Sequence, residues 1–246
     1  MTLIDHHTKA IRIKLFAKLL LTALGIIGVP SIAQGQISKA VIQEVIDGEQ
    51  VYIQTKQAKV KDQANFGEVI STKESRAAIL FNNGAQGRLS DNAQVTVGQC
   101  VDVEKGELLI SGPVNGCIDG LTVEVKGTLY LLKKKDNDTS TIQVLEGTIQ
   151  VINQNKPGQL EVKAGQQCEI LQGVYGPAIP MSQEEIVTIL KGKLFKDFQI
   201  PVTTDDALNK VCSKLLPGLS CSSSGLPSYP LPIPSIPVPL PFTLPY

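Results

Sequence analysis

Apolar and polar residues alternate with a period of two along most of the chain, from Ala40 to about Leu171. The alternation is clearest in four short runs: Val123–Val125, Ile142–Val144, Ile149–Val151 and Leu160–Val162. Such a pattern is typical of strands with one face in a core and the other in water. The region 40–172 is therefore predicted to hold about ten to twelve short strands.

Turn dipeptides separate the apolar runs. They are Asp47-Gly48, Asn83-Gly84, Asn115-Gly116, Asp119-Gly120 and Pro157-Gly158. Asn-Gly and Asp-Gly tolerate the positive φ that tight hairpin turns require. Most strands should then pair with their sequence neighbours, giving a mainly β fold: an antiparallel β-sandwich or a solenoid-like β domain. The spacing of the runs is irregular and indicates no strict repeat.

The stretch Ser75–Val97 carries two glycines close together with an arginine just after them, which raises the question of a phosphate-binding loop. A phosphate loop has the spacing G-x-x-x-x-G-K-[ST], whereas Gly84 and Gly87 are three residues apart and Arg88 follows directly. Alternating apolar residues on both sides instead predict a hairpin. Arg76 and Arg88 are then expected on the surface, or opposite carboxylates on neighbouring strands.

The pattern becomes helical after residue 180. Ser182 and Glu185 have the spacing of a capping box, and a helix is predicted over 183–191. A second helix is predicted to begin near Thr203 or Thr204. Both helices are short, and we expect them to rest on the sheet or to pair with each other.

The chain therefore divides into a β domain (40–172), a short helical segment (181–216) and a proline-rich tail (217–246). The tail holds nine of the 15 prolines. Proline lacks the N–H that helices and central strands need, so the tail is predicted to be polyproline II or disordered. It would act as a spacer or docking peptide, or else be a solvated tail without a partner.

The N-terminus resembles a secretory signal peptide. Four basic residues between Lys9 and Lys18 precede the apolar run Leu19–Val29, and small residues follow. Residues 1–33 are therefore predicted to be removed by cleavage between Ala33 and Gln34. The alternative is an uncleaved leader, which would be the only expected attachment to a membrane.

Cleavage would change the net charge of the chain and the side chains available for catalysis. It would remove four of 23 basic and one of 23 acidic residues, which leaves a net charge of −3. This balance argues against nucleic acid as a partner, because phosphate backbones require a basic face. It would also remove His6 and His7, the two histidines of the chain. Imidazole-based nucleophile systems and histidine-ligated zinc are then not expected.

The five cysteines contain no Cys-x-x-Cys pair, which argues against zinc-ribbon and thioredoxin-like sites. In an exported chain disulfides are expected, and we predict Cys100 with Cys117 and Cys212 with Cys221, leaving Cys168 buried. Reduced, packed cysteines are the alternative.

Four segments resemble the periplasmic domain of the FecR family, in the same order and spacing. They are Thr72–Leu89 (T-x-x-S-R-A-x-x-x-F-x-N-G-x-x-x-R-L), Val125–Tyr130, Val144–Val151 and Leu160–Gln166, and the resemblance covers Ala40 to Leu171. The residues that carry it are Thr72, Ser75, Arg76, Gly84, Arg88, Gly127, Thr128, Gly147, Gly165 and Gln166.

This resemblance implies a bacterial, extracytoplasmic, mostly β domain with no known catalytic residues. The leading hypothesis is thus an exported, non-enzymatic module without a cofactor, which binds or scaffolds an envelope protein or a glycan in the periplasm or at the cell surface. One alternative is the extracytoplasmic sensor of a sigma-factor regulatory system. A third is a carbohydrate-active enzyme, for which Glu104 and Glu107 are candidate carboxylates.

Overall fold

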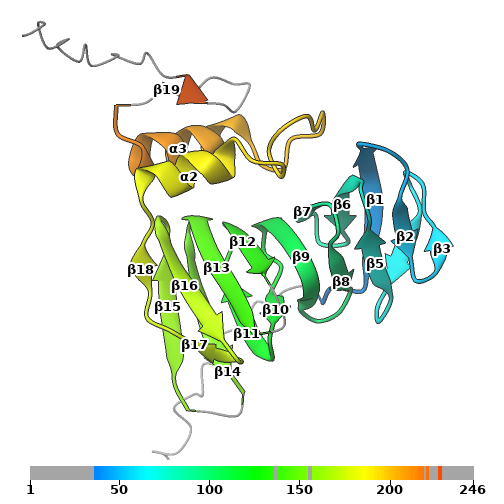
Figure 1. Ribbon diagram of the computed structural model, residues 1–246, viewed down its shortest axis with the longest axis horizontal. Helices are drawn as coiled ribbons and strands as arrows, with labels where there is room; N and C mark the ends of the chain where they lie inside the picture. The colour runs from blue at the N-terminus through cyan, green and yellow to red at the C-terminus, as the bar shows by residue number, and fades with distance from the viewer. Residues whose placement is uncertain (1–35, 136–137, 155–156, 219, 222–226, 229–246) are drawn as a thin grey trace, which may run out of the picture. The chain divides into compact units, whose positions relative to one another are not determined.

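The computed structural model describes residues 36–135, 138–154, 157–218, 220–221 and 227–228. Eighteen strands in this part of the chain form one mixed, largely antiparallel sheet, and two helices follow, α2 (Gln183–Leu190) and α3 (Asp205–Leu215) (Figure 1). The mainly β prediction is confirmed. The predicted strand number for residues 40–172 was too low, because strands such as β3 (Lys56–Gln57) are only two residues long and show no alternation. Strand β17 (Val174–Tyr175), beyond that region, is equally short.

This 18-stranded sheet is folded into two layers, here called sheet A and sheet B. Sheet A contains, in spatial order, β4 (Gln63–Asn65), β1 (Lys39–Ile46), β6 (Arg76–Phe81), β7 (Gln86–Leu89), β9 (Val101–Gly112), β12 (Thr128–Lys134), β13 (Thr139–Glu146) and β16 (Gln166–Leu171), which pairs with both β17 and β18 (Ile179–Pro180). Sheet B contains β3, β2 (Val51–Ile53), β5 (Val69–Thr72), β8 (Gln94–Thr96), β9, β10 (Gly116–Ile118), β11 (Leu121–Val125), β14 (Thr148–Asn153) and β15 (Gln159–Lys163).

Strand β9 belongs to both layers and joins them. Its first half pairs with β8 and β10 in sheet B, and its second half pairs with β7 and β12 in sheet A. Gly106 lies between the two halves with φ +76°, a conformation that glycine adopts without strain. The pairing of β9 with β10 is parallel, whereas the other pairings named above are antiparallel.

The main hydrophobic core lies between the two layers. Buried side chains from both sheets, such as Phe81 and Tyr130 of sheet A and Ile70 of sheet B, form one cluster. The outer face of sheet A is also buried near its centre. Leu129 and Leu131 alternate with Tyr130, so they point away from the main core and belong to a second hydrophobic cluster on that face. Burial on both faces explains why β12 is almost continuously apolar rather than alternating.

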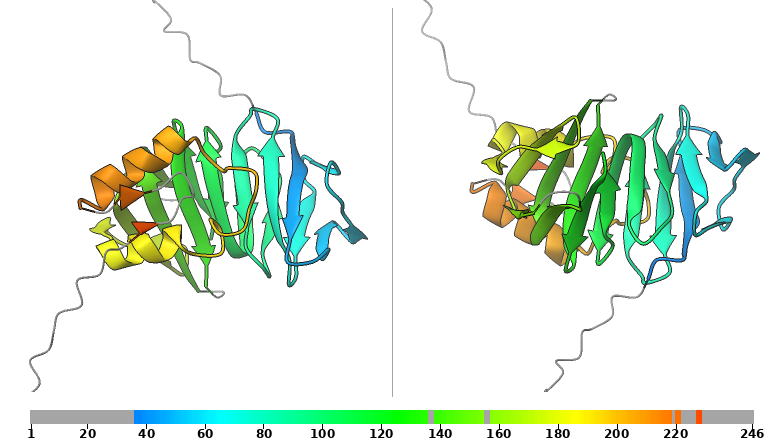
Figure 2. Two further views of the ribbon diagram at one scale, coloured as in Figure 1. Left: turned by 90° about the horizontal axis from the view of Figure 1, so that it is seen from above. Right: turned by 90° about the horizontal axis from the view of Figure 1, so that it is seen from below.

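Helices α2 and α3 contribute further buried side chains to this second cluster. Both helices lie over one face of the sheet (Figure 2). Ile186 and Leu190 of α2 and Val211 of α3 pack with Leu131 and Leu145 from the outer face of sheet A. Helix α2 begins with the predicted capping box, in which the backbone amides of Ser182 and Glu185 each donate to the side chain of the other residue. Of the two predicted start positions for α3, Thr203 and Thr204, Thr204 is the N-cap. Of the two expected arrangements, resting on the sheet or pairing with each other, the first is confirmed.

Three glycines of the FecR-like motifs are corner residues. Gly127, Gly147 and Gly165 have φ values of +81°, +81° and +84°, and each lies where the chain passes from one layer to the other. Their role is therefore to let the chain turn. The predicted turn at Asn115-Gly116 was wrong, because Gly116 is the first residue of β10, with no positive φ, and pairs with Val101 and Val123.

Cys100 and Cys117 form a disulfide, and the buried thiol of Cys168 is free. Cys212 is in a disulfide, and the side chain of Cys221, its predicted partner, lies outside those described. The signal-peptide prediction, with Ala33 and Gln34, and most of the proline-rich tail also fall outside the described residues. Neither helix in the described part of the chain is long and apolar enough to cross a membrane.

Candidate functional site

Arg76 of β6 and Arg88 of β7 are buried, with 5% and 4% of their surface exposed. The prediction of surface positions was therefore wrong. Arg76 does have a carboxylate partner, because its Nε donates to Asp47. This hydrogen bond raises the pKa of Arg76 and lowers the pKa of Asp47.

Arg88 binds backbone rather than carboxylate. Its Nη1 donates to the carbonyl of Leu194 at 2.7 Å and its Nη2 to the carbonyl of Ile200 at 2.6 Å. Burial lowers the pKa of Arg88 to about 10, so the guanidinium stays protonated at neutral pH. Charged donors make the strongest hydrogen bonds to carbonyls, which suits this side chain to hold a distant segment of chain.

The segment held in this way is 193–200, here called the clamped segment, between α2 and α3. Arg76 Nη1 donates to the carbonyls of Lys193 and Lys196, the latter at 2.9 Å. Glu44 of β1 accepts hydrogen bonds from the amides of Gln199 and Ile200, at 2.9 and 3.1 Å. Two motif arginines and one carboxylate of sheet A thus fix the connection between the helices.

The remaining motif residues also serve the fold. The Thr72 hydroxyl donates to the carbonyl of Ser90 at 2.7 Å and accepts from the amide of Ala93 at 2.8 Å. The Ser75 hydroxyl accepts from the amide of Gln50 at 2.9 Å. Gly84 has φ +85° in the β6–β7 hairpin, which agrees with the interpretation of this stretch as a hairpin rather than a phosphate loop.

Thr128 and Gln166 are the last two of the FecR-like motif residues. Thr128 follows the corner glycine Gly127 and is buried. The side chain of Gln166 accepts a hydrogen bond from the amide of Lys163 at 2.9 Å and so closes the β15–β16 turn. The motif residues are spread through the β domain and do not converge on one cavity.

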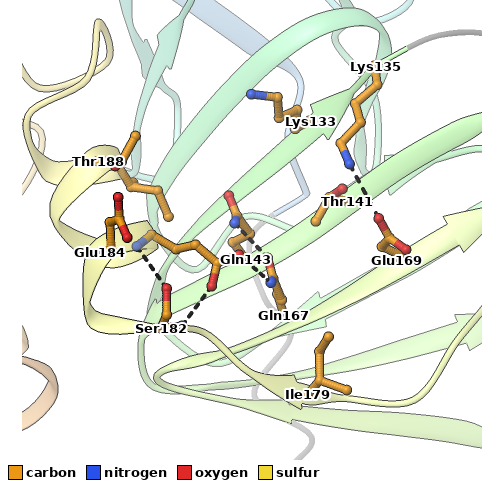
Figure 3. Close-up of a pocket in the computed structure, with 12 residues that line it drawn as sticks. Lys133, Lys135, Thr141, Gln143, Gln167, Glu169, Ile179, Ser182, Glu184 and Thr188 are labelled. Carbon is orange, nitrogen blue, oxygen red and sulfur yellow. Dashed lines mark hydrogen bonds and ion pairs between the residues drawn. The ribbon is translucent and has the colours of Figure 1, made fainter.

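A separate feature, a groove of about 550 Å³, lies between the outer face of sheet A and helix α2 (Figure 3). Residues of β12, β13, β16 and β18, or next to them, line it together with α2 and its N-cap: Lys133, Lys135, Thr141, Gln143, Gln167, Glu169, Ile179, Ser182, Glu184, Glu185, Thr188 and Ile189. We call it the sheet–helix groove. It occupies the part of the outer face beyond the apolar cluster under the helices.

Two glutamine side chains lie at the centre of the groove (Figure 3). Gln143 and Gln167 are register partners on β13 and β16, and Gln143 Nε2 donates to Gln167 Oε1 at 2.8 Å. Gln167 Nε2 in turn donates to Glu185 Oε1 of α2 at 2.9 Å. These amides therefore link the floor of the groove to its helical wall.

Thr141 lies one row further along the same strands, opposite Glu169. It is 4% exposed, and its hydroxyl has no hydrogen-bond partner among the described residues. A buried hydroxyl without a partner costs free energy, typically about 1–3 kcal/mol. It thus marks a polar position that the residues around it leave unsatisfied.

The charges of the groove are largely paired within the protein. Lys135 Nζ lies 3.4 Å from Glu169 Oε1, and Lys133 pairs with Glu107 of β9. Hydrogen bonds with the backbone of Ser182 and with Gln167 lower the pKa of Glu185. A carboxyl held ionised in this way is poorly suited to act as a general acid.

The carboxylates considered for glycoside chemistry are also engaged. Glu104 accepts hydrogen bonds from Gln94 and Thr96, and Glu107 pairs with Lys133. Among the described residues, no group of three or more His, Cys, Asp or Glu side chains could hold a metal ion.

Sequence reasoning did not identify the groove. Thr141, Gln143, Gln167 and Glu169 occupy the polar positions of two alternating strands, which are usually solvated. The available signal was weak: Thr141 and Gln143 alternate on β13, and their register partners on β16, Glu169 and Gln167, follow 28 and 24 residues later. Only the pairing of the strands brings them together.

No family model matches the chain, and no curated protein matches it. Two crystal structures of a putative anti-sigma factor from Parabacteroides distasonis ATCC 8503 are similar to it, each at 13% identity with a TM-score of 0.43. The similarity covers 50% of this chain and 65% and 64% of the two solved chains. The match therefore spans just under two thirds of that protein's length.

Proposed function

We propose that the chain is an exported, non-enzymatic, FecR-like binding module of the bacterial cell envelope, and that the sheet–helix groove is its ligand-binding surface. The observation that carries the proposal is the buried Thr141 hydroxyl in the groove, which has no partner among the described residues. Ligand sites are typically concave and present a few well-placed polar groups. The groove has this character, with its amides fixed between β16 and α2.

Two further features support an extracytoplasmic location. The Cys100–Cys117 disulfide is typical of chains that fold in oxidising surroundings such as the periplasm or the cell exterior. The basic, apolar and small-residue pattern before Gln34 is typical of an export signal. The bacterial assignment depends on the FecR-like motifs alone.

A sensor role is the second candidate, and the clamped segment favours it. Arg76 and Arg88 connect sheet A to the residues between α2 and α3, and α2 forms one wall of the groove. A ligand that moves α2 would therefore act on the helical segment through these arginines. Such a connection is what a domain needs to report binding to another protein.

Photo-crosslinking from the groove tests the proposal. The full chain, with its own leader, is produced in bacteria with a benzophenone amino acid at Thr188, an exposed groove residue. The matched control carries it at Glu124, an exposed position on β11 of sheet B. Benzophenone inserts into C–H bonds and so captures proteins and glycans alike.

We expect an adduct in intact envelopes from position 188 and none from position 124, identified by mass spectrometry. Adducts that form equally from both positions, or from neither, would contradict a binding role for the groove. A captured sigma-factor regulator or outer-membrane receptor would favour the sensor role.

A further inference from the structure

The groove floor presents hydrogen-bonding groups that are not fully used. Each glutamine NH₂ carries two N–H groups, and Gln143 and Gln167 each donate one bond, to Gln167 and Glu185. The two amides are held edge to edge by their register, so their remaining N–H groups have fixed positions. Planar amides in fixed positions match ligands that carry several neighbouring hydroxyls, which both donate and accept.

The paired charges of the groove argue against an ionic ligand. Lys133 is engaged by Glu107 of the neighbouring strand β9, and Lys135, just after β12, is engaged by Glu169 of β16. An anionic ligand would compete with Glu107 or Glu169 for these lysines, and it would also meet Glu184 and Glu185 on the helical wall. Since like charges across an interface are costly, an uncharged ligand fits this lining better.

Apolar surface borders the amides. Ile179 of β18 is 45% exposed and Ile189 of α2 is half-buried, and both line the groove. Ile179 is the register partner of Gln167 on β18, on the side of Gln167 opposite Gln143 (Figure 3). A sugar ring has C–H faces that need such apolar surface and hydroxyl edges that need amides. The Thr141 hydroxyl, which is buried and has no partner among the described residues, would pair with a ligand hydroxyl at the floor after a rotation of its side chain toward the groove.

We infer that the ligand of the sheet–helix groove is an uncharged, hydroxyl-rich saccharide, and this inference rests on the proposed binding function. Gln143 and Gln167 would bind ring hydroxyls, Thr141 would bind one hydroxyl at the floor, and Ile179 with Ile189 would contact the C–H face of a ring. A polar peptide is the competing occupant, and the test below separates the two.

Calorimetric titration with defined probes tests the inference. The purified full-length protein, secreted with its own leader, is titrated with cellotetraose, maltotetraose and tetra-N-acetylchitotetraose. Tetragalacturonate serves as the charged comparator and tetraserine as the peptide comparator. We expect at least one neutral tetrasaccharide to bind, and tetragalacturonate and tetraserine to bind at least about tenfold more weakly, if at all.

Four variants locate the binding. Thr141→Val removes the hydroxyl at nearly constant volume and should weaken binding about tenfold, whereas Thr141→Ser keeps the hydroxyl and should bind as wild type. Gln143→Leu should also weaken binding about tenfold or more, because it removes a floor amide. Thr122→Val, on β11 of sheet B, is the matched control and should leave binding unchanged. Circular dichroism shows that each variant is folded.

Three results would overturn the inference: no binding of any neutral tetrasaccharide, tighter binding of tetragalacturonate or tetraserine, or equal binding by Thr141→Val and wild type. These failures are distinct from failure of the proposed function. A groove-specific crosslink from Thr188 to a protein, with no tetrasaccharide binding, would keep the binding module and reject the saccharide.

Discussion

The guanidinium carbon of Arg88 lies 4.4 Å from the centroid of the Phe198 ring, although 110 residues separate the two in sequence. Arg76 approaches the same ring at 5.4 Å. A cation over an aromatic face is attracted by the ring quadrupole, most strongly where water is excluded. Phe198 therefore adds to the hydrogen bonds that fix the clamped segment on sheet A.

Arg88→Met should loosen the clamped segment. The variant keeps an apolar stem but leaves the carbonyls of Leu194 and Ile200 without their charged donor. We expect a loss of about 2–4 kcal/mol in the free energy of unfolding and faster hydrogen exchange at the amides of residues 193–200. Urea denaturation and exchange mass spectrometry measure both effects.

Lys59→Met is the control, because Lys59 is exposed. Its unfolding free energy and its exchange in the clamped segment should match wild type. Exchange in residues 193–200 that Arg88→Met leaves unchanged would show that the arginine does not hold them.

The two corner glycines Gly127 and Gly147 form a matched pair for a second prediction. Both have φ +81°, so alanine at either position is strained by about 1–2 kcal/mol. A Cβ at Gly127 would meet no atom within 4 Å, whereas at Gly147 it would lie 2.7 Å from Thr128 Cγ2. Gly147→Ala should therefore be the more destabilising variant, by about a further 1–3 kcal/mol.

Urea denaturation of Gly127→Ala and Gly147→Ala gives the comparison directly. Equal losses in the two variants would mean that Thr128 moves aside at no cost. Equal stability of Gly127→Ala and wild type would mean that the backbone at this corner relaxes from its positive φ.

The sequence predicted well those features that depend on neighbouring residues. Alternation identified strands such as β13 and β14, and the Ser182–Glu185 spacing identified the start of α2. Both signals are local, because a strand exposes one face and a helix start needs a cap within one turn.

Features that depend on distant residues were not predictable. The carbonyls that bind Arg88 lie 106 and 112 residues further along the chain. The local sequence shows only an arginine in an alternating strand, which predicts a surface position. The groove likewise depends on β13 pairing with β16 and on α2 folding back over sheet A. In each case the polar residue is ordinary in sequence, and its position follows from the tertiary fold.

The Cys100–Cys117 disulfide should contribute to stability mainly through the unfolded chain. It links residues 17 apart and so closes a short loop. Loss of such a crosslink typically costs about 3 kcal/mol. The double variant Cys100→Ser/Cys117→Ser should show this loss in urea denaturation. The double variant is preferable to a reductant because Cys212 is also in a disulfide. A transition midpoint equal to that of wild type would show that the bond does not constrain the unfolded chain.

The Cys168 thiol should stay protonated and unreactive in the folded protein. It is fully buried in the core between the layers, and this burial raises its pKa to about 11. In the unfolded chain the thiol ionises with a pKa of about 8.5. Its contribution to stability is therefore present below about pH 8.5 and is lost as the pH rises toward 11.

Two measurements check this prediction against Cys168→Ala. Between pH 8.5 and 11 the unfolding free energy of wild type should fall more steeply than that of the variant, by up to about 3 kcal/mol. At pH 8, an aromatic disulfide reagent should modify Cys168 only at the rate at which the protein opens, and urea should accelerate the reaction. Rapid modification in the native state would mean that the core between the layers opens around β16, and parallel pH profiles would mean that the thiol is solvated.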